Sequence, residues 1–462
     1  MLRSLQAELL ILDSRVEGSA SASSGAGETA NLAFRVLAAI EDLELNEPLP
    51  RPNRLLAIVP GGRRGAEHAH RFGLGGADEV LGAPDLDEIA HAIRRLGDSG
   101  PPGKVAICLA GGGIEGLLYE LGVLRALDAF LASRPIVDFD LFCGISAGAM
   151  IASFLANGLG PEEILRGLTY GSARLERIRR RDIFDLNLRG VGRRSLSFLG
   201  APFGREKVEA GRLVSLSGVL PCGIFAGDRL RDYLQRQLTR PGMSDRFEDL
   251  RRPLFVGATD QDTSEAVVFG ELGLRHVPIH RAVRASTALV PLYDPEEIDG
   301  RYYIDGAFTR TTNMRVAVNH GATLVILVDP LVPVFAEQPG YVQARGGMFA
   351  STQGLKSLIN GRFDKAVRAL RQLFPDVHFY LFRPEGEEMR ALAGSPMKYF
   401  YRREISDIAF ENTVRKIRNV LPDMSRVFAR HSIVFRDPEY DDPRSAASRP
   451  RPLPLDSLGI DR

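Results

Sequence analysis

The chain has few cysteines and almost no net charge. Its 462 residues include three cysteines, Cys108, Cys143 and Cys222, whose spacing is not that of a metal site. A disulfide framework is therefore not expected, which favours a reducing compartment. The formal net charge is +1, so we expect no nucleic-acid partner on grounds of charge. We also expect neither a metal ion nor a cofactor.

Long apolar runs are missing as well. The first residues lack the basic region followed by an apolar stretch that marks a secretory signal peptide. No stretch approaches the roughly 18 consecutive apolar residues typical of a membrane-spanning helix. These absences predict a cytoplasmic protein whose membrane contact, if it has any, is peripheral.

What the sequence does contain is a serine in a tight turn, Gly144-Ile145-Ser146-Ala147-Gly148. An apolar, strand-like segment precedes it at residues 137–143, and residues 149–156 favour a helix. Strand, turn and helix in this order are typical of a nucleophile elbow, in which small residues flank an exposed serine. The N-terminus of the following helix favours developing negative charge. The pentapeptide therefore predicts that Ser146 is a nucleophile.

A glycine-rich loop, Gly111-Gly112-Gly113-Ile114-Glu115-Gly116, lies about one βαβ unit before that serine. It follows a predicted strand at residues 104–110, and residues 117–127 have apolar side chains at helical spacing. Adjacent parallel strands would bring both loops to the same edge of a sheet. Because glycine lets backbone N–H groups face an oxyanion, this loop is a candidate oxyanion hole.

The same loop has two other interpretations. Gly111, Gly113 and Gly116 fit the dinucleotide-binding pattern G-x-G-x-x-G. That pattern requires an acidic residue at the end of the next strand, where this sequence has the serine elbow. The loop could also be a structural turn without a ligand.

A candidate base lies far downstream. Residues 298–307 predict a short hairpin with Asp299-Gly300 as its turn, and the second strand ends in Asp305-Gly306-Ala307. A carboxylate at a strand end can act as a general base, although an Asp-Gly pair is more often a plain turn. Spacing alone favours the plain turn.

The glycine loop, the serine pentapeptide and the distal Asp-Gly-Ala resemble, in this order, the motifs of the patatin-like phospholipases. Residues 257–265, 282–288 and 321–328 resemble further segments of that family, and the likeness covers roughly residues 101–335. The resemblance implies a three-layer α/β/α sandwich with a mostly parallel central sheet. It also implies hydrolysis of a lipid or lysolipid, as by a phospholipase A or lysophospholipase.

The family implies a catalytic dyad. Ser146 would be the nucleophile and Asp305 the base, with an acyl-enzyme as intermediate. The oxyanion hole would be formed by backbone amides of the glycine loop and the elbow, namely those of Gly111, Gly112, Gly113 and Ala147. The remaining motif residues, Gly144, Gly148, Gly116, Gly306 and Ala307, would frame the site.

The loop departs from the family at Glu115, where Arg or Lys is usual. An inward carboxylate would oppose an oxyanion or an anionic head group. We therefore expect Glu115 to face solvent or to pair with an arginine; otherwise activity is reduced. The alternative function is a regulatory or binding protein on this fold with weak or no catalysis, although the retained Ser146 and Asp305 favour an enzyme.

A Ser-His-acid triad is the competing catalytic hypothesis. His320, His378 and His431 all follow Ser146, so the chain order of an α/β-hydrolase is not violated. Of the three, only His320 is a candidate for a loop that follows a strand, where the histidine of a triad is expected.

The sequence predicts four regions: 1–100 a small α/β module, 101–335 the catalytic domain, 336–436 a mainly helical extension packed on it, and 437–462 a disordered tail. The first resembles a truncated, degenerate receiver domain of response regulators, with Asp13 at the phosphoacceptor position. Ala83 stands where that domain has a lysine. We therefore predict an interaction module, through which the chain could form a homo-oligomer, rather than phosphotransfer. Its helix is expected at residues 30–43, after a loop at residues 19–27.

Residues 174–194 contain eight arginines interleaved with apolar residues. They are Arg174, Arg177, Arg179, Arg180, Arg181, Arg189, Arg193 and Arg194. This pattern suits an anionic membrane surface. The alternative is a solvated face paired with Glu176, Asp182 and Asp185.

Overall fold

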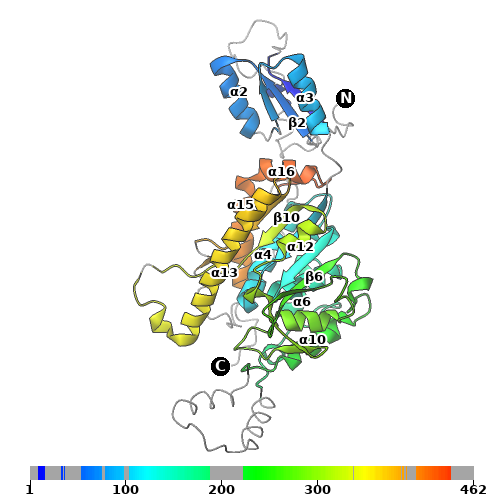
Figure 1. Ribbon diagram of the computed structural model, residues 1–462, viewed down its shortest axis with the longest axis vertical. Helices are drawn as coiled ribbons and strands as arrows, with labels where there is room; N and C mark the ends of the chain where they lie inside the picture. The colour runs from blue at the N-terminus through cyan, green and yellow to red at the C-terminus, as the bar shows by residue number, and fades with distance from the viewer. Residues whose placement is uncertain are drawn as a thin grey trace, which may run out of the picture. The chain divides into compact units, whose positions relative to one another are not determined.

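The computed structural model describes residues 9–15, 33–34, 36, 54–74, 77, 79–97, 103–187, 222–336, 338–386, 388–389, 392 and 402–438. The chain divides into two compact units (Figure 1). The larger unit comprises residues 103–126 and 135–414, and the smaller comprises residues 1–102, 127–134 and 415–462.

An eight-stranded sheet forms the centre of the larger unit. Its strand order is β11-β10-β4-β5-β6-β9-β8, and β7 pairs with β6. The first five strands in this order are mutually parallel, whereas β7, β9 and β8 are antiparallel to their neighbours. The strands are β4 (Lys104–Leu109), β5 (Leu141–Ile145), β6 (Leu254–Asp260), β7 (Ala266–Phe269), β8 (Glu296–Ile298), β9 (Arg301–Asp305), β10 (Ala322–Val328) and β11 (His378–Phe382).

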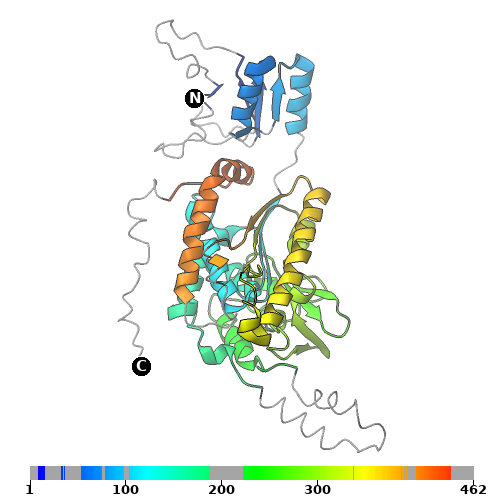
Figure 2. The same ribbon diagram turned by 90° about the vertical axis from the view of Figure 1, so that its left-hand side faces the viewer.

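Helices cover both faces of this sheet (Figure 2). The bounds are α4 (Gly113–Phe130), α5 (Ala147–Ala156), α6 (Pro161–Tyr170), α7 (Arg180–Ile183), α10 (Asp228–Leu238), α11 (Ile279–Ser286), α12 (Met314–Asn319), α13 (Gly346–Leu373) and α15 (Arg402–Asn419). On one face α12 and α13 pack on the strands, with Val316 and Phe363 in a cluster that includes Cys143 and Val325. On the other face α5 and α11 contact β5 and β6.

The observed layers confirm the predicted α/β sandwich with a mostly parallel sheet. The predicted parallel pairing of the strands before the two loops, β4 and β5, is also confirmed. The strand expected over residues 137–143 is wrong at its start. A 3-10 turn at Ile136–Asp138 follows Pro135, so β5 begins only at Leu141.

The smaller unit contains a parallel sheet in the order β1-β2-β3. Its elements are β1 (Leu9–Asp13), β2 (Arg54–Val59), α2 (Gly62–Leu74), β3 (Glu79–Gly82), α3 (Leu86–Gly97) and α16 (Leu421–Ala429). Leu12, Phe34 and Phe72 belong to the core of this sheet. The predicted loop at 19–27, most of the predicted helix at 30–43 and residues 439–462 of the predicted tail lie outside the described residues.

Two further predictions from composition can be compared with the structure. Cys108, Cys143 and Cys222 are all free thiols, and the first two lie opposite each other on β4 and β5. Within the described ranges, no helix is both long enough and apolar enough to cross a bilayer.

Candidate active site

Ser146 stands at the turn between β5 and α5. Its backbone has φ 55° and ψ −124°, a strained conformation that side-chain-bearing residues rarely adopt. The turn leaves no room at its glycines. A Cβ at Gly144 would lie 2.5 Å from the Cα of Ala149, and one at Gly148 would lie 2.3 Å from the carbonyl oxygen of Ala110. This is the geometry of a nucleophile elbow, which holds the serine hydroxyl out from the sheet.

The elbow is fixed from behind by Ser286, the last residue of α11. The backbone amide of Ser146 donates to the Ser286 hydroxyl at 2.8 Å. That hydroxyl donates in turn to the carbonyl of Gly257 on β6 at 2.6 Å. Ser286 is fully buried, so the strained turn is tied to the neighbouring strand without water. Its position at the end of a short amphipathic helix gave no sign of this role in the sequence.

The glycine loop lies against the nucleophile. A Cβ at Gly111 would lie 2.9 Å from the Cβ of Ser146, so a side chain at this position would displace the serine. Gly112 has φ 154°, and Gly116 closes the loop by donating its amide to the Gly112 carbonyl at 3.0 Å. The loop therefore brings backbone, and no side chain, next to the hydroxyl.

Residues of both loops line the cavity beside Ser146. In the part of the chain that the structure describes, the amides of Gly111, Gly112, Gly113 and Ala147 have no hydrogen-bond acceptor. The amide of Gly148, by contrast, donates to the Ala110 carbonyl at 3.1 Å. The first four amides are thus free to bind a negatively charged oxygen, as an oxyanion hole requires.

Asp305 comes to the same place along a different strand. On β6, Gly257 lies opposite Ile145 and Ala258 lies opposite Asp305, so Asp305 and the residue after Ile145 flank β6 at the same level. Asp305 is 1% exposed, its carboxylate accepts a hydrogen bond from the Ala307 amide at 2.9 Å, and the nearby Ser146 hydroxyl lowers the pKa of the carboxyl group. The fold therefore brings together two residues that are far apart in sequence.

Burial changes the acidity of this carboxyl group. It raises the pKa of Asp305 to about 6, against the Ala307 amide and the Ser146 hydroxyl, which both favour the charged form. At neutral pH the group is mostly ionised, yet it accepts a proton more readily than an ordinary aspartate. A general base needs this combination.

Ser146 and Asp305 open onto a mainly apolar cavity of about 150 Å³. Its apolar wall includes side chains from α5, α6, the loop before α7, α7, α10 and the loop before β8, namely Met150, Leu165, Leu168, Ile178, Ile183, Leu230, Leu289 and Leu292. Another part of the wall comes from α13, which contributes Thr352, Leu355, Lys356 and Ile359. Of the described residues that line the cavity, Lys356 is the only cation. The cavity suits an aliphatic chain that ends near Ser146.

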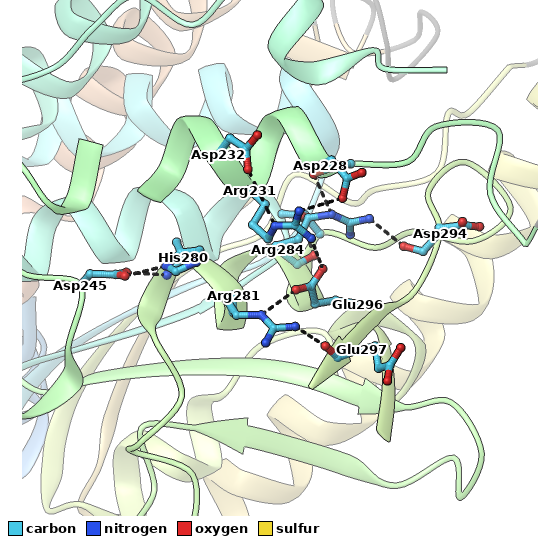
Figure 3. A network of polar contacts seen from close by, with 12 residues as sticks. Asp228, Arg231, Asp232, Asp245, His280, Arg281, Arg284, Asp294, Glu296 and Glu297 are labelled. Atoms are coloured by element: carbon cyan, nitrogen blue, oxygen red, sulfur yellow. Dashed lines mark hydrogen bonds and ion pairs between the residues drawn. The ribbon is translucent and has the colours of Figure 1, made fainter. Parts of the chain in front are cut away.

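A buried arginine holds one wall of the cavity (Figure 3). Arg284 on α11 is 1% exposed and donates to the backbone carbonyls of Ala226, Gly227 and Asp294. Burial lowers the pKa of its guanidinium. These bonds join the segment before α10 to the segment before β8; α10 itself lines the cavity through Leu230, and the segment before β8 through Leu292 and Tyr293.

Glu296 extends this network. Its carboxylate accepts a hydrogen bond from Arg281 at 2.9 Å and lies 3.7 Å from a guanidinium nitrogen of Arg231 on α10 (Figure 3). The elements that form this wall are thus held together by Arg231, Arg281, Arg284 and Glu296, none of which lines the cavity.

The Glu115 side chain does not face solvent, contrary to one of the two expectations from sequence. It is 3% exposed, and its charge raises the pKa of Lys356, which burial lowers. The sequence did not predict this neighbour, because α13 lies beyond the segments that resemble the family. A lysine close to the glycine loop offsets a carboxylate that would otherwise oppose an anion there.

None of the described residues that line the cavity is a histidine. His320 follows α12, where its Nδ1 bonds to the Val316 carbonyl and its ring packs on Phe255. His378 begins β11, and His431 belongs to the smaller unit. The structure brings no histidine to Ser146, so it gives the triad hypothesis no support.

Comparison with known families agrees with this geometry. Residues 107–318 match the sequence model of the Patatin family, described as patatin-like phospholipase. The chain contains a patatin-like phospholipase domain. This domain spans β4 to α12 and carries the glycine loop, Ser146 and Asp305. The match supports lipid hydrolase activity.

Solved structures that resemble this chain include two bacterial proteins. VipD from Legionella pneumophila is 15% identical, with 69% of this chain and 67% of that chain covered and a TM-score of 0.33. The type III effector ExoU is 16% identical, with 69% of this chain covered and a TM-score of 0.29. The chain spans about half of the length of ExoU, 53%. A second ExoU structure, from Pseudomonas aeruginosa and in complex with SpcU, is 14% identical, with 68% and 53% covered and a TM-score of 0.27.

Proposed function

We propose that this protein is a lipid acyl hydrolase of the phospholipase A or lysophospholipase type. It acts through a Ser146–Asp305 dyad and an acyl-enzyme intermediate. One observation carries the proposal: Ser146 and the buried Asp305 line the same apolar cavity, with the serine hydroxyl close enough to lower the pKa of the carboxyl group. The patatin-like domain supports the lipid substrate class.

In the first half of the reaction Ser146 attacks the ester carbonyl carbon. Asp305 takes the hydroxyl proton and then delivers it to the leaving alcohol, so that an acyl-serine remains. The tetrahedral oxyanion is bound by the amides of Gly112, Gly113 and Ala147, with that of Gly111 also within the loop. Each donor contributes on the order of 3 kcal/mol to the transition state.

In the second half Asp305 removes a proton from water, which attacks the acyl-serine. The serine leaves with that proton and the fatty acid departs. The raised pKa of Asp305 serves both halves, because the group must accept and return a proton near neutral pH. The cavity wall would hold the acyl chain and exclude bulk water.

Hydrolysis of short p-nitrophenyl esters and of phospholipid vesicles tests this proposal. Ser146→Ala and Asp305→Asn should both lose activity by at least roughly 10³-fold, the scale seen when catalytic groups are removed. Asp299→Asn is a matched control, because Asp299 lies in the same hairpin with its side chain 70% exposed. Ser146→Ala with the activity of wild type would refute the enzyme and favour a regulatory or binding role.

A membrane-binding surface at residues 174–194 is a further part of the proposal. Arg177, Arg179 and Arg181 are exposed. Asp182 and Asp185, offered above as partners of the arginines, accept hydrogen bonds from backbone amides. Pairing does occur elsewhere on this surface: Arg174 lies 3.3 Å from Glu163, and Glu176 lies 3.0 Å from Arg240. Arg180 also has interacting neighbours.

Vesicle sedimentation tests that surface. Arg189, Arg193 and Arg194 lie outside the described residues, so the test uses the described arginines. Replacing Arg177, Arg179 and Arg181 with glutamine should reduce binding to vesicles containing anionic lipid. Equal binding of wild type to neutral vesicles would remove the electrostatic part of the proposal.

For the N-terminal module we propose an interaction role, as in a degenerate receiver domain. Asp13 ends β1, and Arg15 donates to both of its carboxylate oxygens. Burial alone would raise the pKa of Asp13, but the Arg15 contacts lower it overall. An arginine at this carboxylate would compete with a phosphoryl donor. Sedimentation of the full chain and of a chain without residues 1–100 should show a homo-oligomer only for the former, and stable labelling of Asp13 by acetyl phosphate would overturn this interpretation.

A further inference from the structure

Helix α13 contributes more to the site than a wall. Thr352, Leu355, Lys356 and Ile359 line the cavity at spacings of three and four residues, which places them on one face of the helix. Arg362 follows at the same spacing, one turn further along. All of these residues lie beyond residue 318, where the patatin-like match ends.

Arg362 grips the turn that follows Asp305. Its Nη1 donates to the Phe308 carbonyl and its Nη2 to the Ala307 carbonyl, each at 2.6 Å. Both carbonyls belong to the 3-10 turn Gly306–Phe308. The Ala307 amide, in the same turn, donates to the Asp305 carboxylate at 2.9 Å. The guanidinium is therefore two hydrogen bonds away from the base.

The charge of Arg362 is not balanced by a neighbouring acid. Among the described residues no carboxylate lies within ion-pair distance of it, and burial is the one cause that lowers the pKa of its guanidinium. Its Nε is buried without an acceptor. The Arg362 side chain is half-buried. Withdrawing part of a cation from water costs free energy, and the hydrogen bonds to the two carbonyls offset that cost.

We propose that Arg362 is a positioning residue that holds the Asp305 turn in the geometry needed for proton transfer. The inference rests on the proposed Ser146–Asp305 dyad. The forked guanidinium fixes two successive carbonyls at once, and the turn in turn fixes the carboxylate toward Ser146. If the fork is removed, the turn gains freedom and the carboxylate leaves the reach of the hydroxyl for part of the time.

Steady-state kinetics of the full chain on a short p-nitrophenyl ester tests the proposal. Arg362→Met keeps the apolar stem and removes both donors. Its kcat should fall by roughly 10- to 100-fold, as for a misplaced catalytic group, while KM stays nearly unchanged. Arg362→Lys should recover part of kcat, because an ammonium group can reach one carbonyl.

Arg371→Met is the matched control. Arg371 lies on the same helix and donates to a backbone carbonyl, that of Phe379 on β11, away from Asp305. It should leave kcat unchanged. An equal fall in both methionine variants would assign the loss to the stability of α13 and overturn the proposal.

The other possible results distinguish a failure of this proposal from a failure of the proposed function. If Ser146→Ala is inactive and Arg362→Met has the kcat of wild type, Arg362 is not a positioning residue and the dyad stands. If Ser146→Ala is active, the proposed function itself fails. If Arg362→Met does not fold, the proposal is tested with Arg362→Lys instead. A kcat equal to that of wild type in Arg362→Lys would show that the two hydrogen bonds of the guanidinium are not required.

Discussion

The backbone amide of Ser146 donates to the side chain of Ser286 at 2.8 Å, across two elements that are 140 residues apart. The Ser286 hydroxyl donates in turn to a backbone carbonyl of β6, the strand that pairs with the strand of Asp305. One hydroxyl therefore links the strained elbow to the strand that sets the position of the base. The relative placement of the two catalytic candidates depends on this link.

Ser286→Ala should weaken both the fold and the reaction. The variant leaves the Ser146 amide and the Gly257 carbonyl buried without partners, which costs about 1–3 kcal/mol each. The elbow then relaxes from its strained backbone, and we expect kcat to fall by at least roughly 10-fold. Urea unfolding and ester hydrolysis measure the two effects.

Ser425→Ala is the control for that variant. Ser425 is also buried and donates to a carbonyl, that of Pro422, but it lies in the smaller unit. It should lose some stability and keep kcat. A Ser286→Ala enzyme with full kcat would show that the elbow holds its geometry without the link.

The pH dependence of the reaction should follow Asp305. The carboxylate must be deprotonated to act as a base, and burial raises its pKa to about 6. We expect kcat/KM to fall tenfold per pH unit below about pH 6 and to be level above it. A pH profile on a neutral ester, whose own charge does not change, measures this. A half-maximal point near pH 4 would mean that the carboxylate is solvated in the working enzyme.

The backbone geometry of the two loops could be predicted from the sequence because each is a local requirement. Gly144 and Gly148 are needed where the turn has no space for a Cβ, and that need is visible in a pentapeptide. The strand ends that carry Gly111 and Ser146 follow from the βαβ pattern. Local signals of this kind survive without any knowledge of the rest of the chain.

The supporting residues could not be predicted in this way. Ser286, Lys356 and Arg362 reach the site only after distant segments pack together. The resemblance at residues 282–288 included Ser286 without indicating its contact, and nothing in the sequence marked Lys356 or Arg362. The surroundings of Glu115 have the same origin. Its burial was not visible in the sequence, and the lysine whose pKa it raises comes from a helix more than 200 residues away.

The Glu115–Lys356 pair should affect which esters the enzyme prefers. Glu115→Gln removes the carboxylate that balances Lys356 at the cavity wall. We expect the ratio of kcat/KM for anionic over neutral esters to rise roughly fivefold, the effect of about 1 kcal/mol of charge interaction. Comparing paired esters that differ only in a terminal carboxylate measures the ratio.

Lys356→Met in the same background completes the test. The double variant should return the ratio to near or below the wild-type value, because the unbalanced cation is gone. A ratio that stays high in the double variant would show that Lys356 does not act on the substrate.

The buried base should also cost stability. Below about pH 4 the Asp305 carboxyl is protonated in both the folded and the unfolded chain, so it causes no loss. As pH rises toward 6, the unfolded chain ionises at the ordinary pKa of 3.8 while the folded chain resists until about 6. Folding stability therefore falls across this window by about 3 kcal/mol, and the loss persists at neutral pH.

Asp305→Asn should remove that loss, so the inactive variant should be more stable than wild type at pH 7.5 by up to about 3 kcal/mol. The asparagine fits the site, because its carbonyl can accept from the Ala307 amide and its amide can donate to the Ser146 hydroxyl. Urea unfolding at pH 4, 6 and 7.5 measures the difference, which should vanish at the lowest pH. Asp299→Asn, at an exposed turn, should show no such trend. An Asp305→Asn chain that is less stable than wild type at pH 7.5 would contradict this prediction. It would mean that the ionised carboxylate of Asp305 stabilises the folded protein.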